Sequence, residues 1–266
     1  MKKDNRLLKF FMPLIAVIYG FLMPALAAFV LGDEFRVSEY LLSDVIQIVT
    51  IAITVLIAFK VLPRLFTGVE NFKPVKPSGF VLGGIILLIP LFIILKYRII
   101  ELLVVREELT YISLFSTIDE LKEDLIAGIS AVFLAPVLEE LSFRYMALVP
   151  FKGKGSRIAV SVVVSVFFAV FHFRNFIGVF IDSLVMCTIF LCTKNIIYSI
   201  WWHMCNNLMV IIFGLLSYVG FGNIRITESY PLILLTDHKL IVICICCAVI
   251  GSVLLLYRRK VHKITV

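Results

Sequence analysis

Long apolar runs recur from one end of this chain to the other, and they limit what it can fold into. Several reach the roughly 20 residues that an α-helix needs to cross the hydrocarbon core of a bilayer. In this chain 61% of the residues are hydrophobic. A soluble domain has a smaller fraction of apolar residues, and charged residues interrupt its apolar runs. The pattern predicts an all-α, polytopic helical bundle in a membrane.

We expect about eight transmembrane helices in a single transmembrane domain, residues 1–266. Both ends of the chain are basic, and an even number of spans places both termini on the cytoplasmic side of the cell membrane. The first apolar run has no small-residue cleavage site, so we interpret it as a retained span and not as a signal peptide. The predicted spans are residues 7–31, 41–62, 79–95, 125–150, 156–173, 176–193, 195–221 and 240–257.

The segment 96–124 mixes apolar and charged residues and has an acidic balance. We predict that it lies in the membrane interface as one or two short amphipathic helices. Its acidic character places it on the outer side, together with the loop 32–40. The basic loops 60–78 and 151–157 fall on the cytoplasmic side by the same rule.

The charge and the cysteines indicate which classes of molecule the protein is expected to bind. The net charge of +7 lies mostly in the tails and loops, where it acts as a topology signal. No basic stripe with interleaved aromatic residues is present, so we expect no nucleic-acid partner. The six cysteines all fall in apolar runs without a CxxC pair, which favours a packing role. The lipid bilayer is the partner that composition implies, and the sequence does not indicate an oligomeric state.

Two adjacent carboxylates, Glu139 and Glu140, stand with Arg144 in an otherwise apolar run. Charge inside a membrane is costly, so it needs partners and usually a task. Glu140 and Arg144 are four residues apart and share a helix face, so we predict an ion pair between them. Glu139 points about 100° away and can serve a different purpose. Pro136 predicts a bend in the helix near these residues.

Two further spans carry imidazole side chains. His172 ends the fifth span, and Phe168 lies one turn earlier as a packing partner for its ring. His203 and Asn207 are four residues apart on one face of the seventh span. The tryptophans at 201–202 are interpreted as part of an interfacial aromatic belt.

Together these groups have the chemistry to hydrolyse an acyl bond. A carboxylate and an imidazole can activate water as a general base, or bind a metal that does so. A second histidine and an asparagine can donate hydrogen bonds to the developing oxyanion. Each group alone also fits a structural role, as does Asp182 in the sixth span, for which we favour a helix–helix hydrogen bond or a loop position. Three spans that each offer Glu, His or Asn favour a shared site.

The sequence resembles the CAAX protease and bacteriocin-processing family, also called Abi proteins, over roughly residues 125–215. We therefore take these residues as the catalytic core helices. No GxSxG elbow and no HExxH pair offers a competing motif. The three motifs that carry the resemblance are Glu139-Glu140-x-x-x-Arg144, Phe168-x-x-x-His172 and His203-x-x-x-Asn207.

The resemblance implies an intramembrane endopeptidase of about eight helices and a role for each motif residue. It leaves two mechanisms open, a metalloprotease with one divalent zinc ion and a metal-free glutamate protease. Three ligands are the usual number at a catalytic zinc site, and Glu139, His172 and His203 would supply them. In the family pattern Glu139 and His172 would activate the attacking water, His203 and Asn207 would stabilise the oxyanion, and Glu140 and Arg144 would hold the site together.

Counting residues along each predicted span places these side chains at different depths in the membrane. At 1.5 Å per residue, Glu139 and His203 lie about 12–15 Å from the cytoplasmic end of their spans, and His172 lies about 24 Å from it. We therefore expect the fifth helix to start deeper than Ser156, or to be tilted or bent.

Three function hypotheses follow. The leading one is an intramembrane endopeptidase that cleaves a membrane-associated peptide or protein, of the prenylated CaaX type or of the bacteriocin or signal-peptide type. The second is a non-catalytic membrane scaffold, such as an immunity or regulatory protein, in which the motif residues are structural contacts. The third is a proton-coupled transporter with Glu139 and His172 as a relay. It predicts repeat symmetry, and the sequence has no internal repeat.

Overall fold

We describe the fold from a computed structural model of the chain. It describes residues 39–57, 60, 76–104, 111–112, 128, 130–172, 176–218, 224–227, 234–235 and 238–264. The predicted span 7–31 and most of the segment 105–124 lie outside the described residues.

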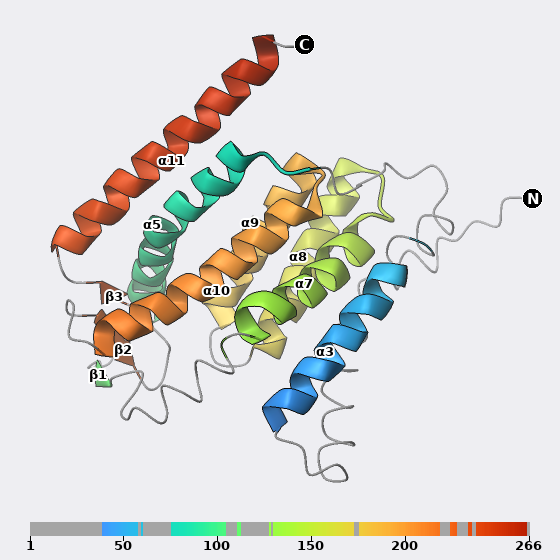
Figure 1. Ribbon diagram of the computed structural model, residues 1–266, viewed down its shortest axis with the longest axis horizontal. Coiled ribbons are helices and arrows are strands. Elements are labelled where there is room, and N and C mark those ends of the chain that lie inside the picture. The colour runs from blue at the N-terminus through green and yellow to red at the C-terminus, as the bar shows by residue number, and fades with distance from the viewer. Residues whose placement is uncertain are drawn as a thin grey trace, which may run out of the picture. The chain divides into compact units, whose positions relative to one another are not determined.

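The described chain is almost wholly helical, which confirms the predicted helical fold (Figure 1). Within the described residues, four helices are long and apolar enough to cross a membrane, and a shorter apolar helical stretch covers Ile241–Leu256. The protein is thus a multi-pass membrane protein, while the count of eight spans and the side of each terminus stay predictions. The helices are α3 (Glu39–Leu56), α5 (Gly79–Val104), α7 (Ala135–Glu140), α8 (Lys154–Phe171), α9 (Phe176–Thr193), α10 (Ile196–Tyr218) and α11 (His238–Ile264), with π-helical stretches η3 (Ser130–Leu134) and η4 (Leu141–Met146).

A small antiparallel sheet, which the all-α prediction did not include, joins distant parts of the chain. It has the order β1 (Tyr111–Ile112), β2 (Ile224–Thr227), β3 (Leu234–Leu235). Tyr111 pairs with Thr227, and Ile224 pairs with Leu235. Strands this short are stabilised by pairing and carry little periodic signal of their own.

The described helices group into two compact units. The first contains α3, η3, α7, η4, α8, most of α9 and the first turn of α10. The second contains α5, the three strands, the rest of α10, and α11. The single domain predicted over residues 1–266 stays a prediction.

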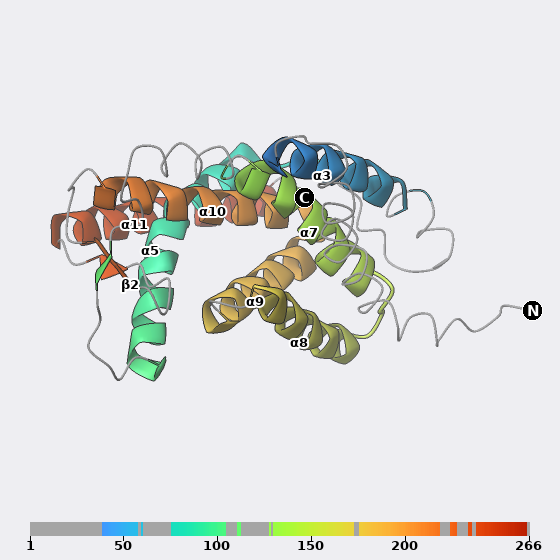
Figure 2. The ribbon, with the colours of Figure 1, turned by 90° about the horizontal axis from the view of Figure 1, so that it is seen from below.

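In the first unit, the segment that carries the two glutamates is surrounded by other helices. Helix α3 packs on η3, α7 and η4. Helices α8 and α9 lie side by side (Figure 2), and Ser165 Oγ contacts Cys187 Sγ between them at 4.0 Å. Every residue from Glu140 to Pro150 is buried. This buried core holds the charged groups described below.

In the second unit, α5 and α11 approach closely where two glycines meet. A Cβ atom added at Gly251 would lie 2.9 Å from the carbonyl oxygen of Gly84 and 2.9 Å from Leu87 Cβ. Small residues of this kind let the backbones of membrane helices come into direct contact. The α5–α11 pair is therefore held by backbone proximity.

Helix α5 continues to Val104, so the end predicted at Leu95 is too early. Lys96 was expected to start the interfacial segment, but it is buried, with 3% of its surface exposed. Its Nζ lies 4.9 Å from the centroid of the Tyr97 ring and 5.7 Å from that of Phe92. These cation–π contacts help a charged residue to remain within an apolar helix.

A sharp turn separates α9 from α10. Lys194 has a positive φ of 53°, and its backbone N–H donates to the carbonyl of Phe190 at 2.8 Å, as in an αL helix end. Asn195 then accepts a hydrogen bond at its Oδ1 from the backbone N–H of Ile197, at 3.1 Å, which caps α10. The predicted spans 176–193 and 195–221 agree closely with these helices.

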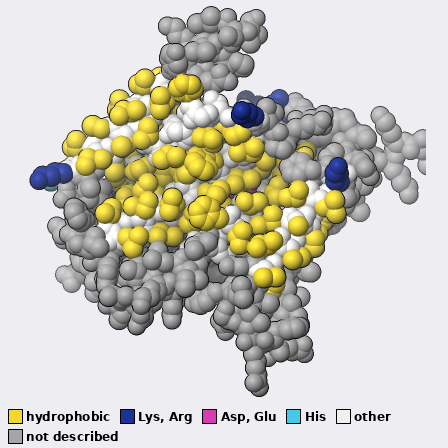
Figure 3. All heavy atoms as spheres, viewed as in Figure 1, with side chains coloured by type: hydrophobic (Ala, Val, Ile, Leu, Met, Phe, Trp, Pro, Cys, Tyr) yellow, Lys and Arg dark blue, Asp and Glu magenta, His cyan; other side chains and the backbone are white. Residues whose placement is uncertain are grey.

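Apolar side chains also cover exposed helix faces. On α11, Val242, Val249 and Val253 are each more than half exposed. Figure 3 shows hydrophobic side chains gathered across the visible face of the described helices, with lysines and arginines near its margins. Such a surface suits contact with lipid tails.

Candidate active site

The glutamates lie in a short α-helix between two π-helical stretches. Helix α7 has only six residues, with η3 before it and η4 after it. Pro136 lies in the first turn of α7, where it has no N–H to donate to the residue four positions earlier. The structure thus departs from α-geometry near Pro136, where the sequence predicted a bend. Interruptions of this kind are frequent at functional sites.

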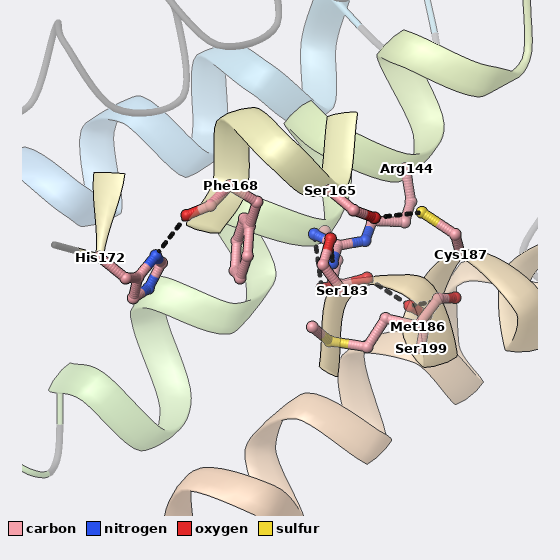
Figure 4. Close-up of polar contacts among 9 residues, drawn as sticks. Arg144, Ser165, Phe168, His172, Ser183, Met186, Cys187 and Ser199 are labelled. Atoms are coloured by element: carbon pink, nitrogen blue, oxygen red, sulfur yellow. Dashed lines mark hydrogen bonds and ion pairs between the residues drawn. The ribbon is translucent and has the colours of Figure 1, made fainter. Parts of the chain in front are cut away.

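Glu140 and Arg144 form the predicted ion pair. Arg144 Nη1 lies 3.2 Å from Glu140 Oε1, and both side chains are fully buried. Each partner also meets a hydroxyl group from a neighbouring helix (Figure 4). Arg144 Nη2 donates to Ser183 Oγ on α9 at 2.9 Å, and Ser199 Oγ on α10 donates to Glu140 Oε2. We call these four residues the polar clasp.

The free-energy cost of burying the polar clasp is offset only while its four members remain in contact. Taking two charges out of water costs several kcal/mol per ion, roughly, and good geometry with further hydrogen bonds must offset that cost. Ser183 and Ser199 provide those further bonds. Neither serine could be predicted as a partner, because both are single hydroxyls in apolar runs that meet the ion pair only after folding.

Phe168 lies between the guanidinium of Arg144 and the imidazole of His172 (Figure 4). Its ring centroid is 4.6 Å from Arg144 Cζ and 4.6 Å from the centroid of the His172 ring. The ring of Phe143 meets it edge-on, with centroids 5.2 Å apart. The predicted packing of Phe168 on His172 is confirmed, and the same ring also links His172 to the polar clasp.

His172 is the C-cap of α8, and its ring is oriented by the backbone. Its Nδ1 lies 2.7 Å from the carbonyl oxygen of Phe168. A carbonyl oxygen only accepts, so Nδ1 carries the proton in this hydrogen bond. Nε2 is then the ring nitrogen with a lone pair, the form that a general base or a metal ligand requires.

The start of α8 bears on the mismatch in depth. The helix begins at Lys154, so the expectation of a start deeper than Ser156 is wrong, and the alternative of a tilted or bent helix stays a prediction. Arg144 meets Phe168 directly, and the chain reverses direction through the short connection 151–153. Arg144 and Phe168 are therefore neighbours, and Glu140 and His172 each lie one turn farther along their helices from that connection.

Glu139 differs from its neighbour in burial. It is half-buried, whereas Glu140 has no exposed surface. Successive residues on an α-helix point about 100° apart. The two carboxylates therefore differ in their surroundings, with Glu140 in the polar clasp and Glu139 partly exposed.

His203 and Asn207 lie on the part of α10 that belongs to the second unit. His203 is buried, with 5% of its surface exposed, and Asn207 is half-buried. They are one turn apart in an unbroken helix, so they share a face. Contacts link Glu140, Arg144, Phe168 and His172 within the first unit.

Both tryptophans beside His203 contact α5, and its burial removes Trp202 from the predicted aromatic belt, which stays a prediction for Trp201. Trp202 is buried, and its ring meets Phe92 on α5 edge-on, with centroids 5.0 Å apart. Trp201 Nε1 donates to the carbonyl oxygen of Leu82 at 3.1 Å. Both rings therefore pack α10 against α5 within the second unit.

Within the described part of the chain, no group of three or more His, Cys, Asp or Glu side chains is arranged to hold a metal ion. The residues proposed as ligands, Glu139, His172 and His203, are all in that part. The lone pair on His172 Nε2 and the carboxylate of Glu139 nevertheless have the donor chemistry of metal ligands.

Comparison with known proteins bears on this site. Residues 121–209 match the family model described as type II CAAX prenyl endopeptidase Rce1-like. That range includes all three motifs. No curated protein and no solved structure matches the chain.

Proposed function

Residues 121–209 belong to the CAAX protease family, and from this premise we propose that the protein is an intramembrane endopeptidase. It hydrolyses a peptide bond of a membrane-associated substrate with a water molecule activated by Glu139 and His172. The observation that carries the proposal is the hydrogen bond from His172 Nδ1 to the Phe168 carbonyl, at 2.7 Å. That bond prepares Nε2 to act, beside a buried ion pair that supports the same aromatic ring.

Glu139 and His172 share the work on the water. A carboxylate that is half-buried can accept a proton from water and pass it to the leaving amine. His172 Nε2 is a second acceptor, oriented by the Phe168 carbonyl and by ring packing. Removing a general base of this kind lowers turnover by about 10²–10⁴-fold.

His203 and Asn207 stabilise the oxyanion in this proposal. Each can donate a hydrogen bond, and their four-residue spacing on α10 directs both to one side. Donors that are already in place when the oxyanion forms contribute strongly, because they need no reorganisation. Loss of one such donor costs about 10²–10³-fold in kcat.

A divalent metal, if bound, would polarise the scissile carbonyl or lower the pKa of a water molecule. The family resemblance implies Glu139, His172 and His203 as its ligands. Metal analysis of the purified protein, before and after chelation, separates the two mechanisms. About one zinc per chain, lost together with activity, indicates a metalloprotease, whereas full activity without bound metal indicates a glutamate protease.

The substrate class follows the family description. We propose a prenylated CaaX-type peptide as the first substrate to examine, and bacteriocin or signal peptides as the next. An active site on transmembrane helices suits a substrate that a lipid group or an apolar segment holds at the bilayer. The proposal retains eight spans and cytoplasmic termini as the topology.

The test is cleavage of a fluorogenic farnesylated CaaX peptide and of an apolar signal peptide by purified protein in liposomes. Wild type should cleave at least one, while Glu139→Ala and His172→Ala should lose about 10²–10⁴-fold in kcat. Cys246→Ser, at an exposed thiol on α11, is a control that should retain full activity. If both site variants cleave as fast as wild type, the endopeptidase proposal is wrong and the non-catalytic scaffold becomes the better hypothesis.

A further inference from the structure

Ser199 joins three elements of the first unit at one buried point. Its side chain has no exposed surface. The hydroxyl donates to Glu140 Oε2, at the end of α7. It also lies 3.3 Å from the carbonyl oxygen of Met186 on α9. A hydroxyl held by two acceptors has little freedom to rotate, and the backbone that carries it is held as well.

Ser199 also shares a helix face with the predicted oxyanion donors. Positions 199, 203 and 207 follow one another at intervals of four residues in the unbroken helix α10. Each interval advances the helix by about 6 Å and turns the side chain by about 40° from the one before. The face of α10 that meets Glu140 therefore continues, one turn later, as the face that carries His203.

Ser183 provides a matched comparison. It is also fully buried, and its hydroxyl accepts a hydrogen bond from the other half of the same ion pair, Arg144 Nη2, at 2.9 Å. It lies on α9, which carries no residue of the three motifs. Ser183 thus makes a similar contact with the same ion pair. Unlike Ser199, however, it does not lie on the helix that carries the oxyanion donors.

We infer that Ser199 is a positioning residue for the oxyanion donors. The inference rests on the proposed endopeptidase function. By binding Glu140, Ser199 sets the rotation of α10 about its own axis, and this rotation determines where His203 and Asn207 point. Glu140 then has two structural tasks: it neutralises Arg144, and it anchors the helix of the third motif.

The inference predicts a loss in kcat and not in substrate binding. A displacement of about 1 Å at catalytic groups can cost about 10²-fold in rate. We expect Ser199→Ala to lower kcat by about 10–100-fold with little change in KM, because donors that act on the oxyanion act in the transition state. Ser183→Ala should lower the melting temperature by about as much as Ser199→Ala does, but it should lower kcat by less than about threefold. Ser199→Thr, which retains a hydroxyl, should recover most of the lost kcat.

The decisive measurement is a double-mutant cycle with Asn207→Ala. If Ser199 acts through the oxyanion donors, Ser199→Ala should cost far less in kcat on the Asn207→Ala background than alone. Fully additive losses, or equal losses of kcat in Ser199→Ala and Ser183→Ala, would overturn the inference. If Ser199→Ala does not accumulate, Ser199→Cys has a similar volume with a weaker donor and takes its place in the cycle.

The same assay distinguishes failure of the inference from failure of the proposed function. An active wild type, an inactive Glu139→Ala and an unaffected Ser199→Ala would contradict only the positioning role. Cleavage by Glu139→Ala at the same rate as by wild type would contradict the endopeptidase proposal.

Discussion

The two units of the molecule hold their helices together by different means. In the first unit, the polar clasp joins helices through a buried ion pair and two hydroxyls. In the second unit, α5 and α11 meet through the backbones of Gly84 and Gly251. Hydrogen bonds depend on direction, so the polar clasp fixes orientation, whereas the glycine contact depends mainly on close approach. Orientation is what catalysis needs, and the candidate catalytic pair Glu139 and His172 lies in the first unit.

The largest effect should come from breaking the polar clasp. Glu140→Ala leaves the fully buried Arg144 without its ion-pair partner, which costs about 3–5 kcal/mol. The protein should melt at a much lower temperature in detergent and accumulate poorly. Glu139→Ala should keep the wild-type melting temperature and lose turnover.

This contrast separates the roles of the two carboxylates. Equal stability and equal inactivity in Glu139→Ala and Glu140→Ala would contradict the division. The double variant Glu140→Leu with Arg144→Leu removes both charges, and should recover much of the stability without the activity.

The second effect should come from overfilling the glycine contact. Gly251→Leu would force side-chain atoms against the carbonyl oxygen of Gly84 and Leu87 Cβ, at a cost of about 1–3 kcal/mol. Gly83→Ala is the matched control, since a Cβ atom there would have no neighbour within 4 Å. Thermal melts of both variants test the contact, and a Gly83→Ala variant as unstable as Gly251→Leu would contradict it.

A smaller effect is expected where the polar clasp meets His172. Phe168→Leu removes the ring between Arg144 and His172, which contributes about 0.5–2 kcal/mol through cation–π and aromatic contacts. Turnover should fall by about 10-fold because the imidazole loses the surface that orients it. Phe133→Leu, at a half-exposed ring on η3, should change neither stability nor kcat.

The smallest effect should come from a neutral contact in the same core. Ser165→Ala removes the 4.0 Å contact with Cys187 Sγ and should lower the free energy of unfolding by less than about 1 kcal/mol. A loss as large as that of Glu140→Ala would mean that polarity in general, and not charge, makes the first unit sensitive.

Apolar runs predicted most helices well, and they did best where no charge intervened. Residues 176–193 were predicted as the helix that is observed as α9. The end of α5 was missed because Lys96 was taken as a boundary, although aromatic rings accompany it in the folded chain. The strands were missed because Tyr111 and Thr227 stabilise each other only after the chain has folded.

The candidate site was predictable to the extent that it depends on spacing along one helix. The Glu140–Arg144 pair and the packing of Phe168 on His172 are both four-residue contacts, and both are observed. Contacts from other helices, at Ser183 and Ser199, could not be read from spacing. The buried packing of Trp202 on Phe92 was missed for the same reason.

The π-helical stretches around α7 have a consequence for how the chain tolerates insertions and deletions. A π-turn spans one more residue than an α-turn, so it behaves as a single-residue insertion that the helix has absorbed. Deleting one residue from η3 would therefore let an ordinary α-helix form, with the residues before it still in register with Glu139 and Glu140. Deleting one from η4, before Arg144, would place the guanidinium three residues from Glu140, a spacing at which side chains on an α-helix are still neighbours. These two stretches should therefore tolerate a single-residue deletion that an uninterrupted α-helix at the same place would not.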